Sequence, residues 1–124
     1  MTMKTLTTEE LLAFRDAEGE TRVIDLGEGK CVRIKALSLD EHLKIVADCR
    51  RSGEWDEIRW NTLVLHYGLV EPKLSVDDAA KVCKKPAGLV YAIIHEILDL
   101  SGLSSVATLS ASAVEEDEEF FREE

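Results

Sequence analysis

The segment HYGLVEPKLSVDDA, residues 66–79, limits the possible folds of this chain more than any other stretch. One helix-like run ends in it and another begins, because Gly68, Pro72 and Ser75 stand close together between two apolar segments. We therefore predict a joint that folds consecutive helices back onto one another rather than one continuous helix.

The run before the joint contains two Trp and one Tyr. Its sequence, EWDEIRWNTLVLHYGL, is apolar over more than one face, which predicts a central and largely buried helix over about 54–67. Gly68 stands where it can cap the C-terminus of this helix in the left-handed conformation.

Two helices are predicted after the joint. Ser75 is suited to cap a short helix over about 76–84, and Pro86 is suited to the first turn of a longer one over about 86–100. Gly102 should end the longer helix. Its apolar residues recur at the spacing of one helix face: Val90, Ile93, Ile94, Ile97 and Leu98. We expect both helices to pack on the aromatic helix as a three-helix unit.

Two further helices are predicted in the N-terminal half, each from a Ser or Thr three positions before a Glu. This capping-box spacing places helices over about 8–17 and about 38–51. In the second helix, the residues expected to form the stripe facing the core are Leu39, Leu43, Val46 and Ala47. Arg50 and Arg51 suit the negative end of its dipole.

A β-hairpin is predicted between these helices, over about 21–37. The runs TRVIDL and CVRIKAL flank GEGK, and apolar and charged residues alternate in the second run at the period of a half-buried strand. Gly27 and Gly29 are expected in the turn. A lone hairpin is marginal in water, so its apolar face should lie against helices or pair with further strands.

These elements predict an α+β chain that is mainly helical, with a packed bundle of about four helices after the N-terminal helix and hairpin. We expect residues 1–103 to form a single compact domain. From residue 104 the composition changes to small polar residues and then to EEDEEFFREE, which predicts a flexible, disordered acidic tail over 104–124.

The charge distribution bears on possible partners. The formal net charge is −10, and residues 115–124 hold seven acids and one Arg. Nucleic-acid binding depends on a basic footprint, so we expect no nucleic-acid partner. No apolar run reaches the roughly 18–20 residues of a membrane span, and the first residues lack the apolar stretch of a signal peptide, which predicts a cytoplasmic protein without a membrane partner.

The sequence contains no motif that indicates catalysis, and we expect neither an enzyme nor a cofactor. There is no phosphate-binding Gly loop, no GxSxG elbow and no HExxH. The three cysteines, Cys31, Cys49 and Cys83, lack the spacing of a zinc site and are expected to be reduced core thiols. The scattered histidines His42, His66 and His95 are expected on helices rather than on a metal.

The aromatic residues are the candidates for partner contacts. Trp and Tyr at helical spacing are more typical of a core, yet they can also form a binding platform, so both readings remain open for them. Phe120 and Phe121, within the acidic tail, could anchor the tail on a partner or simply be solvated. The candidate partner-binding residues are thus Trp55, Trp60, Tyr67, Tyr91, Phe120 and Phe121.

A helix start LSLDEHLKI, a helix ending in LHYGLVEPKLS, a short helix and the segment PAGLVYAIIHEILDLSGLS follow one another before the polar tail. In this order, over roughly residues 30–104, the chain resembles the tail assembly chaperones of long-tailed bacteriophages. The residues that carry the resemblance are Gly68, Pro72, Leu74, Ser75 and the segment ILDLSGL at 97–103.

The resemblance implies a non-enzymatic protein of the host cell cytoplasm that acts during tail assembly and is absent from the mature virion. Its partners would be the tape measure protein, which it keeps soluble, and the tail tube protein, which it recruits; it could also form a homo-oligomer. We expect client contacts from exposed apolar residues of the 54–67 and 87–100 helices, with the hairpin as a further candidate. One alternative is a small phage-encoded adaptor or inhibitor of a basic host protein, and another is an enzyme dependent on a metal or on the thiols.

Overall fold

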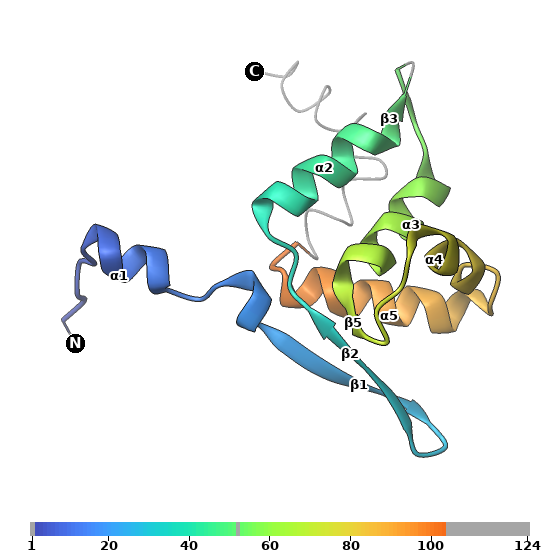
Figure 1. The fold of residues 1–124 in the computed structure, drawn as a ribbon, viewed down its shortest axis with the longest axis horizontal. Coiled ribbons are helices and arrows are strands. Elements are labelled where there is room, and N and C mark those ends of the chain that lie inside the picture. Colours follow the sequence, from blue (N-terminus) through green and yellow to red (C-terminus); the bar gives the residue numbers. More distant parts are fainter. Residues whose placement is uncertain (1, 52, 104–124) are drawn as a thin grey trace.

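The computed structural model of this chain describes residues 2–51 and 53–103 (Figure 1). The fold is α+β, with five α-helices and a small antiparallel sheet among the described residues, about half of which are helical. Within that part, no helix is both long and apolar enough to cross a bilayer.

The elements follow the predicted order, with short strands added. The helices are α1 (Thr8–Ala13), α2 (Leu39–Cys49), α3 (Glu57–Gly68), α4 (Val76–Val82) and α5 (Ala87–Leu100), and a 3-10 turn spans Ala17–Gly19. The strands are β1 (Thr21–Gly27), β2 (Lys30–Lys35), β3 (Arg50–Arg51), β4 (Glu54–Trp55) and β5 (Leu69–Glu71).

The predicted helix starts are confirmed by their caps. The hydroxyls of Thr7 and Ser38 each accept the backbone N–H three residues on, and both capping boxes are complete. Ser75 caps α4 in the same way, accepting the N–H of Asp78. These starts were predictable because a capping box depends only on residues within one turn.

Four predicted helix boundaries differ from those of the structure by two residues or more. Helix α1 ends at Ala13 instead of 17, because Phe14 is extended and Arg15 has a positive φ of 50°. Helix α2 ends at Cys49 instead of 51, and helix α3 begins at Glu57 instead of 54. Between them β3 and β4 pair as a minimal hairpin. Helix α4 ends at Val82 rather than at 84.

The β1–β2 hairpin is confirmed, with Gly27 and Gly29 at positive φ in its turn. Strand β5 then pairs with β2, placing Leu69 opposite Ile34 and Glu71 opposite Arg33. The 66–79 joint therefore adds a third strand to the sheet as well as turning the chain. The hairpin thus obtains the additional strand that a marginal two-stranded sheet requires.

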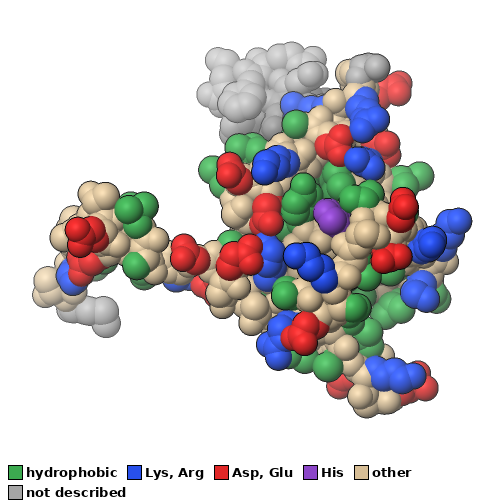
Figure 2. Space-filling model, viewed as in Figure 1, with side chains coloured by type: hydrophobic (Ala, Val, Ile, Leu, Met, Phe, Trp, Pro, Cys, Tyr) green, Lys and Arg blue, Asp and Glu red, His purple; other side chains and the backbone are tan. Residues whose placement is uncertain are grey.

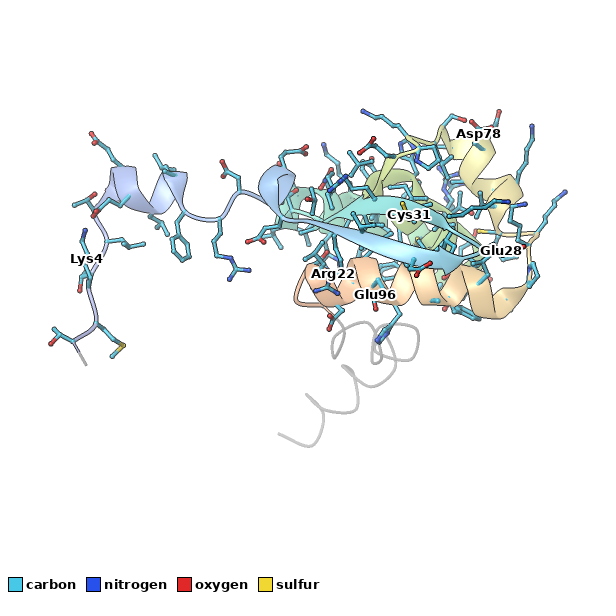
Figure 3. The ribbon with its side chains drawn as sticks, turned by 90° about the horizontal axis from the view of Figure 1, so that it is seen from below. Lys4, Arg22, Glu28, Cys31, Asp78 and Glu96 are labelled. Carbon is cyan, nitrogen blue, oxygen red and sulfur yellow. The ribbon has the colours of Figure 1, made fainter. Side chains whose placement is uncertain are left out.

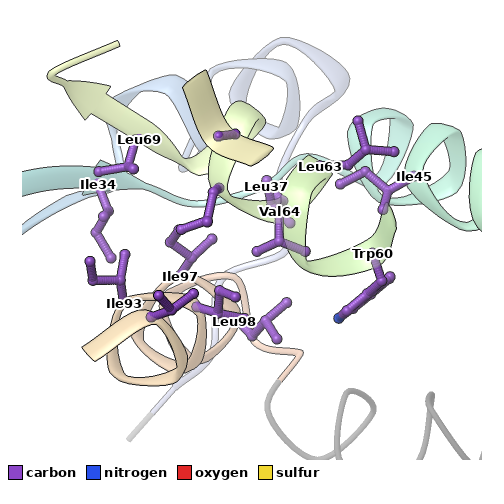
Figure 4. Close-up of a cluster of buried hydrophobic side chains, with 14 of the residues drawn as sticks. Ile34, Leu37, Ile45, Trp60, Leu63, Val64, Leu69, Ile93, Ile97 and Leu98 are labelled. Carbon is purple, nitrogen blue, oxygen red and sulfur yellow. The ribbon is translucent and has the colours of Figure 1, made fainter. Parts of the chain in front are cut away.

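The core lies between the sheet and helices α2, α3 and α5 (Figure 4). The predicted apolar face of α5 is confirmed, because all five of its residues are buried. The largest fully buried side chains come from every layer: Ile34 on β2, Ile45 on α2, Val64 and Leu65 on α3, and Ile97 on α5. Arg22 of β1 also pairs with Glu96 of α5 at 2.7 Å (Figure 3).

Gly68 does not act as the predicted left-handed cap. It is the last residue of α3, and Leu69 follows in an extended conformation as the C-cap. A Cβ placed on Gly68 would lie 2.6 Å from both Cγ2 and Cδ1 of Ile97, which is far below normal contact. Glycine is therefore required at this position because α3 and α5 approach each other closely.

Helix α5 ends at Leu100, and Gly102 stops it as predicted, with a positive φ of 76°. The N–H of Leu103 donates to the carbonyl of Leu98 at 2.7 Å, and the N–H of Gly102 donates to Asp99 at 3.0 Å. Together these two bonds form a Schellman motif, which satisfies carbonyls that the helix end leaves free.

Ser101, at the same helix end, joins α5 to the segment before α2. Its Oγ donates to the carbonyl of Ile97 at 2.6 Å and accepts the N–H of Leu37 at 2.7 Å. We expect Ser101→Ala to lower the free energy of unfolding by about 1–3 kcal/mol, because the Leu37 N–H loses its partner. Urea unfolding tests this, with Ser101→Thr as the control that keeps a hydroxyl. An unchanged midpoint in Ser101→Ala would show that the bridge contributes nothing.

The N-terminal arm, residues 2–16, extends away from the remainder of the described chain (Figure 1). Helix α1 within it has no buried residue. From the 3-10 turn onward the chain contacts itself closely, since Ala36 N–H donates to the Glu20 carbonyl at 2.8 Å.

Candidate functional site

No group of three or more His, Cys, Asp or Glu side chains in the described part of the chain is arranged to hold a metal ion. Cys49 is buried, and desolvation together with the charge of Asp48 raises the pKa of its thiol to about 11. That thiol is a poor nucleophile at neutral pH.

The prediction that all three cysteines are core thiols is wrong for Cys31. Its side chain is exposed on β2, whereas Cys49 is buried and Cys83 is half-buried. Strand β2 lies between β1 and β5, and the burial of its residues increases toward Lys35. Cys31, next to the hairpin turn, therefore lies beyond the core.

The predicted aromatic residues divide into core and surface. Trp60 is 4 % exposed and packs against Trp55, with ring centroids 5.4 Å apart. Trp55 is half-buried and donates its Nε1–H to Glu57 at 2.8 Å. Tyr67 is half-buried as well, whereas Tyr91 on α5 is 56 % exposed. Phe120 and Phe121 lie outside the described residues.

Four apolar residues of helix α2 were predicted to face the core, and that prediction is wrong for Leu39, Leu43 and Ala47, whereas Val46 packs against the core. Leu39 is 72 % and Leu43 is 54 % exposed, Ala47 is exposed and Val46 is half-buried. The residues that α2 buries are Ile45 and Cys49. We call the stripe of Leu39, Leu43 and Ala47 the outer face of α2.

A second apolar stripe on one helix could have been recognised in the sequence. Leu39, Leu43 and Ala47 recur every fourth residue, while Ile45 and Cys49 define a different side. A helix that packs on only one neighbouring layer needs one such stripe. Two stripes indicate that one of them is available to another molecule, and only the three-dimensional packing shows which.

The outer face is bordered by charged residues. Asp40 and Lys44 are exposed on α2. Asp48, at the end of the helix, pairs with Arg51 at 2.9 Å and with Arg59 of α3 at 2.7 Å. These hydrogen bonds lower the pKa of the Asp48 carboxyl. An apolar stripe with a polar rim is the usual composition of a protein-binding surface.

Helices α3 and α5 expose less apolar surface. Of the large hydrophobic side chains on α3 only Ile58 is exposed, and on α5 only Tyr91. Each is isolated on its helix, whereas Leu39 and Leu43 are neighbours one turn apart. The outer face of α2 is therefore the more continuous candidate surface.

His42 lies on the inner side of α2 and is expected to make the stability of the protein depend on pH. Its ring packs edge-on against Trp60 at 6.1 Å, its buried Nδ1 has no hydrogen-bond partner within residues 2–51 and 53–103, and burial lowers the pKa of the imidazole. The unfolded chain then binds a proton more readily than the native one, so stability falls as the pH drops through the unfolded value of about 6.5.

Urea unfolding at pH 7.5 and pH 5.5 measures this effect. We expect the wild type to lose stability on acidification and His42→Gln to lose less, because the amide does not titrate. Carboxyl groups with a lowered pKa, such as that of Asp48, act only at lower pH. An equal loss in both proteins would contradict a role for His42.

Comparison with known proteins gives this arrangement no counterpart: no protein-family model matches the chain, and neither the curated proteins nor the solved structures contain a significant match.

Proposed function

We propose that this chain is a tail assembly chaperone of a long-tailed bacteriophage. It binds the tape measure protein, keeps that long helical protein soluble, and recruits tail tube subunits during tail assembly. It acts in the host cytoplasm and is not retained in the mature virion. The proposal combines the sequence resemblance over residues 30–104 with an exposed apolar face on α2.

The observation that carries the proposal is the exposure of Leu39 and Leu43 on a helix whose other side is in the core. The inner side fixes α2 to α3, so the outer face is held in place before a client arrives. Such a surface is suited to an amphipathic helix that lays its own apolar stripe against it. Fully burying each leucine contributes about 1.5–3 kcal/mol.

The net charge of the chain supports its proposed role in keeping the client soluble. A long helix with an uncovered apolar stripe aggregates in water unless another surface covers it. The net charge of −10 gives the complex a strong like charge, which keeps complexes apart. A chain with these two properties can both cover a client and keep it dispersed.

The proposal also includes the predicted finer architecture. Helices α2 to α5 form the packed bundle of about four helices, and residues 104–124 are the acidic tail of the chain. Phe120 and Phe121 in that tail contact a second partner, the tube subunit, while the outer face of α2 holds the client. Tyr91 is a further contact for a partner that extends over α5.

Co-expression tests the proposal. A tape measure protein from the same genome is expressed with and without this chain, and the soluble fraction of the tape measure protein is measured. We expect a marked increase in that fraction and co-purification of the two proteins. A soluble fraction that does not change would overturn the chaperone function. Tight binding to a basic host protein instead would favour an adaptor or inhibitor.

A further inference from the structure

The N-terminal arm presents a capped helix whose apolar side chains are not covered by the other described residues. Leu11 and Leu12 of α1 are 62 % and 73 % exposed, and Phe14 beside them is exposed as well. Two views at right angles show the arm extending away from the rest of the described chain (Figures 1 and 3). In the space-filling view its hydrophobic side chains lie open at the surface (Figure 2).

The arm is nevertheless specified as a helix. Thr7 and Glu10 form a complete capping box, with bonds of 3.0 and 3.2 Å. Leu6 and Leu11 occupy the two positions of a hydrophobic staple, directly before the cap and four residues after it. Isolated helices shorter than about 12–15 residues are marginal in water, so a helix as short as α1 needs a surface to pack on.

The root of the arm directs α1 away from its own body. Arg15 has a positive φ of 50°, and its Nε pairs with Glu20 at 2.6 Å. The Glu20 carbonyl in turn accepts the N–H of Ala36, directly after β2. Glu18 lies 3.5 Å from the largely buried Lys35. Because the segment after α1 is fixed at these points, the cover for α1 is most readily supplied by another molecule.

We infer that α1 of one copy packs on the outer face of α2 of a second copy, in a reciprocal exchange of arms. Both surfaces are apolar, bordered by charged residues and uncovered by the rest of the described chain: Leu11, Leu12 and Phe14 on the arm, and Leu39 and Leu43 on the face. A two-fold exchange makes the same contact twice, which is the symmetry most homodimers use. It also doubles the buried area, bringing a short helix closer to the roughly 1,200 Å² typical of specific interfaces.

One pair of oppositely charged side chains is compatible with this pairing. Glu9 of α1 and Lys44 of α2 are exposed, and neither takes part in an ion pair within the described ranges. They have opposite signs and border the two surfaces. Each can therefore gain a partner across the interface, although exposed pairs of this kind add little affinity.

The inference deepens the proposed function. Only the regulatory consequence of the arm exchange rests on that function, and the exchange itself does not. If the client helix uses the outer face of α2, the arm of a second copy occupies the same face when no client is present. Client binding then displaces the arm and converts dimers to chaperone–client complexes. Self-association itself needs no client and can be measured without one.

Sedimentation equilibrium of the full chain alone, at physiological salt and over a wide concentration range, tests the exchange. Wild type should form a dimer whose fraction rises with concentration. Leu11→Ser/Leu12→Ser, which changes the arm, and Leu39→Ser/Leu43→Ser, which changes the face, should each weaken the dimer at least about tenfold. Val23→Ser is the matched control, because Val23 is an exposed apolar residue outside both surfaces.

A mixture of the two double variants gives a second readout. One variant retains an intact face and the other an intact arm, so the mixed dimer regains one of the two contacts. We expect more dimer in the mixture than in either variant alone. A monomeric wild type at all concentrations, or a dimer that survives both double substitutions, would overturn the exchange. Neither result concerns the client, so the chaperone proposal is tested separately by co-expression.

Discussion

Replacing Ile97 with Ala should lower the free energy of unfolding by about 2–5 kcal/mol, because a fully buried side chain is truncated between α3 and α5. Gly68→Ala, on the facing helix, should lower it by about 1–3 kcal/mol through overpacking. The new Cβ would meet Cγ2 and Cδ1 of Ile97 at 2.6 Å and Cγ1 at 2.9 Å. The higher helix propensity of Ala offsets about 1 kcal/mol of this loss at most.

The double variant Gly68→Ala/Ile97→Ala tests whether the contact itself is responsible. The three nearest atoms to a Gly68 Cβ all belong to the Ile97 side chain beyond its own Cβ, so removing that side chain removes these three close contacts. We expect the combined loss to be smaller than the sum of the two single losses by about 1 kcal/mol or more. Chemical denaturation of all four proteins provides the cycle.

Gly88→Ala is the matched control for these variants. Gly88 also lies in a helix, but a Cβ there would meet nothing within 4 Å. Its substitution should leave stability unchanged or raise it by up to about 1 kcal/mol. If Gly68→Ala were as stable as Gly88→Ala, the close approach of α3 and α5 would be refuted.

Leu39→Ser/Leu43→Ser should abolish client solubilisation in co-expression. Each leucine contributes about 1.5–3 kcal/mol when fully buried, so losing both weakens binding by about a hundredfold or more. Because both side chains are exposed in the single chain, the free energy of unfolding should change by less than about 0.5 kcal/mol per site. The soluble fraction of the tape measure protein and the urea midpoint of the purified variant are the two measurements.

Val23→Ser is the control for client binding as well. Val23 is exposed on β1, and its substitution should leave client solubility at the wild-type value. An equal loss of client solubility with Val23→Ser would mean that general surface hydrophobicity, and not the outer face of α2, is responsible. A large loss of folding stability in Leu39→Ser/Leu43→Ser would show that the face is structural.

Features set by neighbouring residues were predictable from the sequence. The capping boxes at Thr7 and Ser38 and the stop at Gly102 each depend on one helical turn. The apolar face of α5 was predictable for a related reason, since its single stripe is so strong that it leaves one way to bury the helix. The β1–β2 hairpin combines alternation with glycines that tolerate positive φ in its turn.

Features set by distant residues were not predictable. Strands β3, β4 and β5 contain two or three residues each, too few to show a period, and β5 exists because it meets β2. Gly68 looks like a cap in sequence, and its packing role appears only when Ile97 lies opposite it. A glycine near a helix end is therefore ambiguous until its neighbours in space are known.

The candidate site shows the same division. The sequence allowed Trp60 to be either a core residue or a binding residue. It is a core residue, because it is buried and packs against Trp55 and against His42, which lies on the inner side of α2. The outer face of α2 was missed because Leu39 and Leu43 have ordinary core spacing. Which of two apolar stripes is buried depends on the elements that cover α2, and the sequence of α2 alone does not specify them.

Site-specific photo-crosslinking tests most directly whether the outer face of α2 holds the client. A photoreactive phenylalanine analogue replaces Ala47, which is exposed on that face, or Ala80, which is equally a small exposed residue but lies on α4. Each protein is irradiated in the presence of the tape measure protein. The account predicts a crosslink to the tape measure protein from position 47 that greatly exceeds the one from position 80. Equal crosslinking from both positions, or crosslinking from position 80 alone, would contradict it.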